Sequence, residues 1–363
     1  MEDRVRDHAE VLVDWSARVE AGDDVVVSVA EGAHDLGVAV ADALGDRGAT
    51  CLALYGSDEL SRAYLRAHEG EFAESAAERA LFEEADVYLA LGGGRNTAAT
   101  ADVPGDVRSA YARARRGVRE ARMDTDWVST VHPTRSLAQQ AGMSYEAYRD
   151  FVYDAVLRDW ESLAAEMAQL KERFDAGEEV RLVKGDTDLT MSIADRTAVN
   201  SAASVAYDSH NLPSGEVFTA PATAEGEVYF DVPMTIQGQR VRDVRLAFDD
   251  GEVVDFSAGT NEGVVADVLG TDAGARRLGE LGVGMNRGID RPTDNVLFDE
   301  KMGGTVHLAL GRAYDACLPA DEAGNESAVH VDLITDVSED ARLEVDGEVV
   351  QRDGRFRWEE GFE

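Results

Sequence analysis

The sequence predicts two domains, an α/β domain followed by an α+β domain that is rich in strands. In the first half, apolar runs of strand length alternate with segments of helical periodicity, a pattern typical of a parallel sheet with flanking helices. From residue 179 onward, short alternating segments separated by Asp-Gly turns predict antiparallel hairpins. A chain of 363 residues is long enough to form both domains.

The α/β domain is expected to span residues 1–178. Its first twenty residues have the spacing of an amphipathic helix. Four apolar runs predict strands, at 23–30, 49–56, within 76–94 and at 127–134. The glycines at 92–94 lack the spacing of a phosphate-binding loop, so we interpret them as a turn at the end of a strand.

A change of pattern begins near Met143. Residues 144–177 predict one long amphipathic helix, with Ser144 as its N-cap and Gly177 as its stop, which bridges the two domains. The strand-rich domain is expected to span 179–363 and to carry the functional site. Within it, residues 264–286 predict a helix and a turn, followed by a second helix or an extended segment.

The chain is strongly acidic, with 72 acidic and 35 basic residues and a net charge of −37. The acid is spread along the whole chain, so it predicts a hydrated, halophilic surface of the kind found in haloarchaea, whose self-repulsion is screened by salt. Such a charge argues against nucleic-acid binding. The absence of a long apolar run argues against a membrane protein. A charged N-terminus and two isolated cysteines, Cys51 and Cys317, favour a cytoplasmic location.

Two histidines near the C-terminus lie in short runs typical of strands. His330 and Asp332 are two residues apart, so on a strand their side chains point to the same face and could form half of a metal site. His307 lies in a second apolar run, and Tyr314 follows it closely. Either histidine alone would more often be a buried structural residue than a ligand.

Two glutamates in apolar surroundings complete the candidate set. Glu216 lies between two prolines, and Glu280 enters a run of glycines and apolar residues. A buried glutamate is costly unless it binds something, although either residue could instead cap a helix or lie exposed. Three carboxylates with two imidazoles suit a pair of zinc, cobalt or manganese ions. Two such ions, about 3.5–4 Å apart, activate water for hydrolysis.

Four motifs in this half resemble the aminopeptidase T family of thermophilic aminopeptidases. They are NLPSGEVFTAP at 211–221, LGE at 278–280, LFDEKMGGTVHLALGRAY at 297–314 and NESAVHVD at 325–332. The resemblance extends through most of the chain and is weaker before about residue 130. One departure is Val331, where the family often has an aromatic residue. On a strand that side chain points away from the site.

The resemblance implies a two-metal aminopeptidase that acts on short peptides, as a homodimer with enclosed active sites. The matching positions imply five metal ligands, namely Glu216, Glu280, His307, His330 and Asp332. Tyr314 matches the active-site tyrosine and would stabilise an oxyanion, and Glu216 or Glu280 would transfer a proton to the leaving amine. Two alternatives stay open: a metal-free hydrolase, such as a glycosidase, that uses the two glutamates, and a binding protein without turnover.

Overall fold

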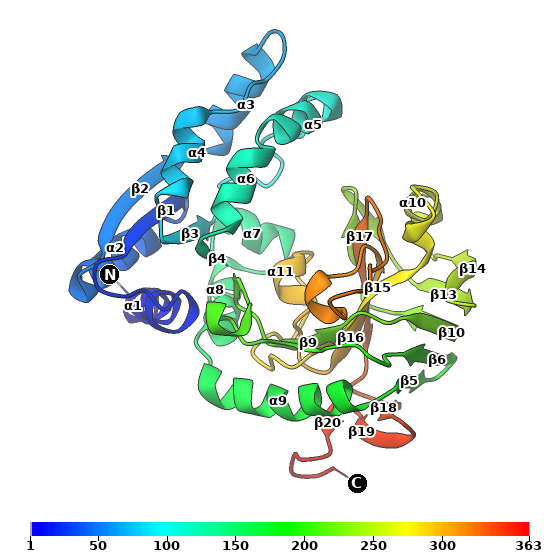
Figure 1. The fold of residues 1–363 in the computed structure, drawn as a ribbon. Coiled ribbons are helices and arrows are strands. Elements are labelled where there is room, and N and C mark those ends of the chain that lie inside the picture. Colours follow the sequence, from blue (N-terminus) through cyan, green and yellow to red (C-terminus); the bar gives the residue numbers. More distant parts are fainter. Residues whose placement is uncertain (1, 363) are drawn as a thin grey trace. The chain divides into compact units, whose positions relative to one another are not determined.

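The structure, a computed structural model, describes residues 2–362 as two compact units (Figure 1). The first unit ends at Arg158 and also includes Ala203–Pro213, while the second consists of Asp159–Ala202 and the chain from Ser214 onward. The predicted boundary at residue 178 is therefore displaced. Among the described helices, none is both long enough and apolar enough to cross a membrane.

The first unit contains a parallel sheet of five strands, in the order β2-β1-β3-β4-β8. The four predicted strands are present, with bounds Asp24–Ala30 (β1), Thr50–Gly56 (β2), Val87–Gly92 (β3) and Asp126–Val131 (β4). The fifth strand, Asn211–Leu212 (β8), was not predicted. Central strands are buried because their side chains are apolar on both faces, whereas β2 is an exposed edge.

Short helices make up most of the rest of the first unit. They are α1 (Asp3–Glu10), η1 (Val11–Ser16), α2 (His34–Arg47), α3 (Asp58–Ala67), α4 (Ala76–Glu83), α5 (Gly105–Ala114), α6 (Arg116–Met123), α7 (Arg135–Gln140), α8 (Tyr145–Val156) and η2 (Val205–Tyr207). The fifth strand, β8, explains why residues 203–213 belong here. It pairs with β4 through Ser129 and Thr130, so the chain returns to the first sheet after it has left it.

The prediction of one long helix over 144–177 is wrong, because the structure has two helices in this range. Ser144 caps α8 as expected, accepting a hydrogen bond from the amide of Ala147 at 3.2 Å. The helix then ends at Leu157, whose φ of −88° and ψ of 57° are not helical. Asp159 begins α9 (Trp160–Ala176), where its carboxylate accepts from the Ser162 amide at 3.1 Å. Helix α9 packs on β7 and β9 and so belongs to the second unit.

The second unit is built from antiparallel strands, as predicted, and its described residues form three sheets. An eight-stranded sheet has the order β14-β13-β10-β6-β5-β18-β19-β20, a five-stranded sheet has the order β17-β16-β15-β9-β7, and β11 pairs with β12. The strand bounds are Glu179–Lys184 (β5), Thr187–Ser192 (β6), Val199–Ser201 (β7), Glu216–Thr219 (β9), Thr223–Phe230 (β10), Met234–Ile236 (β11), Gln239–Val241 (β12), Val244–Asp249 (β13), Glu252–Ser257 (β14), Leu278–Gly284 (β15), Thr305–Gly311 (β16), His330–Asp336 (β17), Ala341–Val345 (β18), Glu348–Arg352 (β19) and Arg355–Phe356 (β20).

The Asp-Gly turns were predicted correctly, because β13 and β14 meet at residues 250–251 and β18 and β19 at 346–347. Of residues 264–286, the first part is helical as predicted, and the last part takes the extended alternative as β15 (Leu278–Gly284). The helical elements of this unit, besides α9, are α10 (Glu262–Leu269), η3 (Gly274–Arg276), α11 (Val296–Asp299) and η4 (Asp315–Cys317).

Candidate metal centre

One face of the five-stranded sheet carries all five predicted ligands. Directly paired residues of neighbouring antiparallel strands point to the same face. Glu216 of β9 pairs with Gly284 of β15, and His307 of β16 pairs with Gly282 of the same strand. Strand β17 adds His330 opposite Gly311 and Asp332 opposite Ala309, and Ala309 in turn pairs with Glu280. The opposite face bears apolar residues such as Leu281 and Val283, which are fully buried.

Strand β15 makes room for the site because two of its residues on this face are glycines. A Cβ on Gly282 would lie 2.1 Å from both Cε1 and Nε2 of the His307 imidazole. A Cβ on Gly284 would lie 2.1 Å from the carbonyl oxygen of Met302. The imidazole therefore lies across β15 where any other residue would displace it. On the site face, the LGELGVG sequence therefore places one carboxylate, that of Glu280, and two positions without a side chain, Gly282 and Gly284.

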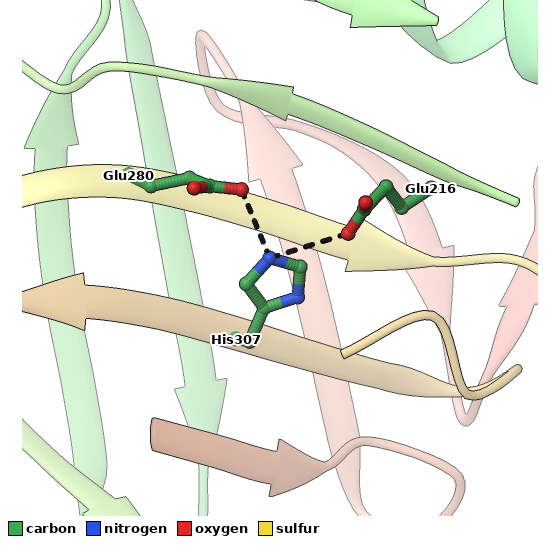
Figure 2. Close-up of side chains that lie close together, drawn as sticks. All are labelled: Glu216, Glu280 and His307. Carbon is green, nitrogen blue, oxygen red and sulfur yellow. Dashed lines mark hydrogen bonds and ion pairs between the residues drawn. The ribbon is translucent and has the colours of Figure 1, made fainter. Parts of the chain in front are cut away.

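Glu280 lies at the centre of the cluster, between the two histidines. Its Oε1 faces His307 (Figure 2). This oxygen is 3.1 Å from Nε2 of His307, and Oε2 is 3.2 Å from Nε2 of His330. Glu216 approaches His307 from the other side, with Oε2 at 3.4 Å from Nε2. Asp332 lies beside His330, with Oδ1 at 3.7 Å from Nε2. The five side chains thus form two groups of three that share Glu280.

The second histidine is oriented by the backbone. Nδ1 of His330 lies 2.8 Å from the carbonyl oxygen of Arg312. A carbonyl only accepts hydrogen bonds, so Nδ1 is the protonated nitrogen and donates to it. Nε2 then points at Glu280 and Asp332 with a lone pair available to a metal.

The buried atoms of the cluster are poorly satisfied by protein partners alone. Glu216, Glu280 and His307 are buried, and the side chain of Asp332 is only 10% exposed. Glu216 Oε2 and Asp332 Oδ1 have no hydrogen-bond partner among the residues that the structure describes. Burying three carboxylates is costly unless cations compensate them. Oxygen and imidazole donors without thiolates fit divalent ions of the zinc type, so these residues suit the implied metal.

Protonation of the metal-free cluster follows from burial and from its internal charges. Burial lowers the pKa of His307, but the hydrogen bond and charge of Glu280 outweigh it and raise the pKa to about 10. Burial also lowers the pKa of His330, but the hydrogen bond with Glu280 and the charges of Glu280 and Asp332 outweigh it and raise the pKa to about 9. Burial raises the pKa of Glu216 to about 7 against the opposing charge of Lys301. Metal binding must displace these protons.

Tyr314 lies at the edge of this cluster. Its ring centroid is 5.0 Å from that of His330 and 5.6 Å from that of Phe218, and the residue is 40% exposed. Burial raises the pKa of the phenol, and the charges of Glu280 and Asp332 raise it further. The phenol therefore stays protonated at neutral pH and can donate a hydrogen bond beside the cluster.

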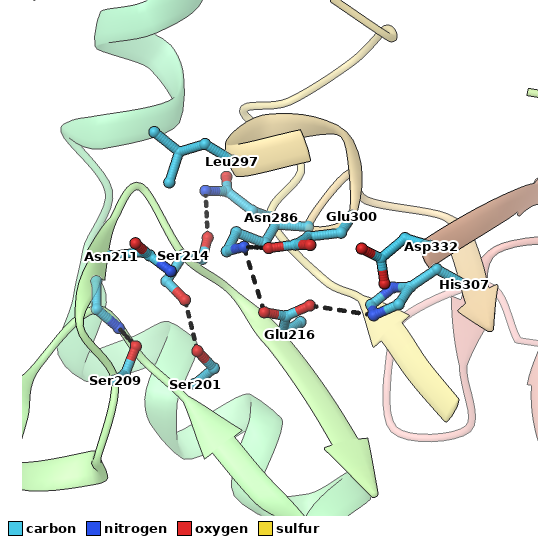
Figure 3. A network of polar contacts seen from close by, with 12 residues as sticks. Ser201, Ser209, Asn211, Ser214, Glu216, Asn286, Leu297, Glu300, His307 and Asp332 are labelled. Atoms are coloured by element: carbon cyan, nitrogen blue, oxygen red, sulfur yellow. Dashed lines mark hydrogen bonds and ion pairs between the residues drawn. The ribbon is translucent and has the colours of Figure 1, made fainter. Parts of the chain in front are cut away.

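Sequence reasoning missed Lys301, which contacts Glu216, and Glu300, which contacts Lys301. Lys301 is fully buried, and its Nζ lies 3.4 Å from Glu216 Oε1 and contacts Glu300 Oε1 directly. Figure 3 shows Glu216 with one oxygen turned toward His307 and the other turned away from it. A signal was available, since Lys301 is one of only three lysines and follows Glu300 inside the DEKMGG motif.

Comparisons with known proteins identify the family of this chain. The family model described as "Thermophilic metalloprotease (M29)" matches residues 1–356. Aminopeptidase T of Thermus aquaticus is 30% identical, with 96% of this chain and 97% of the relative covered. Aminopeptidase T of Thermus thermophilus is 29% identical, with 93% of each covered.

A solved structure carries the same fold. It is described as wild-type AmpT from Thermus thermophilus, and it matches with a TM-score of 0.84 and 26% identity over 98% of this chain and 99% of the other. The predicted combination of an α/β unit and a strand-rich unit is thereby confirmed. A family model that spans nearly the whole chain, together with a buried cluster of histidines and carboxylates, leads to one conclusion: the chain belongs to the thermophilic metalloprotease (M29) family.

Proposed function

We propose that this metalloprotease is an aminopeptidase whose five clustered side chains hold two divalent ions. Glu216, His307 and one oxygen of Glu280 would bind the first ion. The other oxygen of Glu280, with His330 and Asp332, would bind the second. The observation that carries the proposal is the position of Glu280, which directs one oxygen at each histidine. Zinc, cobalt and manganese all accept these donors.

A pair of bound divalent ions lowers the pKa of water and polarises a carbonyl, which is the chemistry of peptide hydrolysis. The chain's own residues would complete the reaction. Tyr314 keeps its proton and would donate a hydrogen bond to the oxyanion that develops on the scissile carbonyl.

A carboxylate would carry the proton to the leaving amine. Glu216 and Glu280 are the carboxylates that sequence analysis assigned to this step, and the structure adds Glu300 beside them. Both oxygens of Glu280 face histidines, whereas Glu300 contacts neither histidine among the described ion pairs, and its side chain is 19% exposed. Glu300 is therefore freer to exchange a proton while the other two act as ligands.

Removal of N-terminal residues from peptides is supported by the relatives, since both are named Aminopeptidase T and match more than nine tenths of this chain. An acidic site also suits a free α-ammonium group, which distinguishes the N-terminus from internal peptide bonds. The metal-free glycosidase alternative would leave His307, His330 and Asp332 without a role. The binding-protein alternative predicts metal uptake without turnover.

Hydrolysis of leucyl and other aminoacyl arylamides in molar salt tests this proposal. Exhaustive chelation should abolish the activity, and zinc, cobalt or manganese should restore it. Activity that is indifferent to chelation would favour the metal-free hydrolase. Metal binding without cleavage of any aminoacyl arylamide or short peptide would favour the binding protein.

Three further properties rest on the family resemblance and on composition. We propose short peptides as substrates, a homodimer, and a halophilic cytoplasmic protein with a net charge of −37. Light scattering in molar salt would measure the oligomeric state, and a mass of one chain would contradict the dimer. Thermal unfolding at decreasing salt would show a falling midpoint if salt screens the acidic surface.

A further inference from the structure

Lys301 is a buried cation beside the proposed metal centre, and the proposed function gives it no role of its own. Its side chain is 0% exposed, which is rare for lysine unless the ammonium is paired. The pairing comes from Glu216 Oε1 at 3.4 Å and from Glu300 Oε1. The two oxygens of Glu216 therefore have different neighbours, because Oε1 faces Lys301 and Oε2 faces His307.

The backbone holds Lys301 in place on both sides. Its amide donates to the carbonyl oxygen of Phe298 at 3.0 Å, at the end of α11, and its own carbonyl accepts from the amide of Asn286 at 3.1 Å. Gly284, the strand partner of Glu216, lets this segment approach closely, since a Cβ there would lie 2.9 Å from the carbonyl carbon of Lys301. The backbone of Lys301 is thus held by contacts other than the one with the Glu216 carboxylate.

We infer that Lys301 is a positioning residue that reserves one oxygen of Glu216. With Oε1 paired to the ammonium, Glu216 offers only Oε2 to an ion beside His307 and acts as a one-oxygen ligand. Within residues 2–362, Oε2 is also the oxygen of Glu216 that has no hydrogen-bond partner. This inference rests on the proposed metal site and adds to it the denticity of one ligand and the residue that sets it.

Loss of the ammonium would free Oε1. Lys301→Met keeps most of the side-chain volume and removes both the charge and the N–H donors, so Glu216 could turn both oxygens to the ion. Lys301→Arg keeps a charge and N–H donors and should restore part of the wild-type behaviour. Lys171→Met is the matched control, because Lys171 forms a surface ion pair with Asp175 on α9, where its side chain is 32% exposed.

The test uses the full chain in molar salt, made metal-free and then loaded with Co²⁺ alone. In Lys301→Met we expect the affinity of one of the two ions to change by about 10- to 100-fold. The visible absorption of Co²⁺ should also weaken, as it does when the coordination number rises. Lys301→Arg should fall between this variant and wild type, and Lys171→Met should match wild type. A folded Lys301→Met protein with wild-type affinity and absorption would overturn the inference.

A second measurement does not depend on the variant folding. A crystal structure of the wild-type protein loaded with Co²⁺ should show Glu216 with one oxygen on the ion and the other on Lys301 Nζ. Both oxygens of Glu216 on the ion would overturn the inference. Failure of wild type to bind Co²⁺ at this cluster would instead refute the proposed function, so the two failures are distinguishable.

Discussion

Replacing Gly282 by alanine tests whether the geometry of β15 sets the position of the His307 imidazole. The added Cβ would lie 2.1 Å from His307 Nε2, whereas ordinary contacts of a Cβ begin at 3.4 Å. The imidazole must therefore move by about 1.3 Å, and His307 is completely buried, so its surroundings resist the shift. A displacement of about 1 Å at a reacting centre costs roughly 10²-fold in rate. Overpacking of this kind also destabilises a fold by about 1–3 kcal/mol.

The assay for Gly282→Ala combines kcat/KM on an aminoacyl arylamide, metal affinity by chelator competition, and thermal unfolding. We expect kcat/KM to fall at least 100-fold and metal to bind more weakly, with a modest drop in the unfolding midpoint. Gly263→Ala is the control, because Gly263 lies in α10 and, outside that helix, no atom of the described residues lies within 4 Å of the added Cβ. This variant should leave activity unchanged. Wild-type metal affinity and activity in Gly282→Ala would refute the account of β15.

Two further predictions concern the phenol and the pH dependence of the metal-free protein. Tyr314→Phe should lower kcat by about 10²- to 10³-fold while the metal content stays at the wild-type level, measured by steady-state kinetics and elemental analysis; an unchanged kcat would remove the phenol from the mechanism. Because the pKa of His307 rises to about 10 on folding and that of Glu216 to about 7, the folded metal-free protein binds more protons than the unfolded chain. The histidine contribution is complete below its unfolded pKa of about 6.5 and is lost as pH rises toward 10. The unfolding midpoint of the chelated protein in molar salt should therefore fall between pH 6 and pH 9, and a rising midpoint would contradict these assignments.

Much of the site could be predicted because its residues lie on strands. His330 and Asp332 share a face by simple alternation, and buried glutamates in apolar runs are conspicuous in sequence. The shared position of Glu280 could not be predicted, because it depends on how β15 pairs with β16. The pairing shifts between Leu278 and Glu280, and such an irregularity re-aims a side chain in a way that the sequence does not reveal.

The fold shows the same division between local and non-local information. Apolar runs and Asp-Gly turns located the strands of both units, since these signals are local. The break at Leu157–Asp159 was missed because helical spacing continues through it. The return of residues 203–213 to the first sheet was missed because two residues pairing with β4 leave no periodic pattern. Lys301 was missed for a similar reason, since its partner Glu216 lies far away in sequence.

The central claim is that two ions share Glu280, and a metal titration of the metal-free protein tests it most directly. Calorimetry with Zn²⁺ in molar salt, checked by elemental analysis, should find two ions per chain in wild type. Glu216 belongs only to the group with Glu280 and His307, so Glu216→Gln should still bind the ion held by Glu280, His330 and Asp332 at close to wild-type affinity. Glu280→Gln should weaken both ions. One ion per chain in wild type, or a Glu280→Gln protein that still binds either ion with wild-type affinity, would contradict the claim.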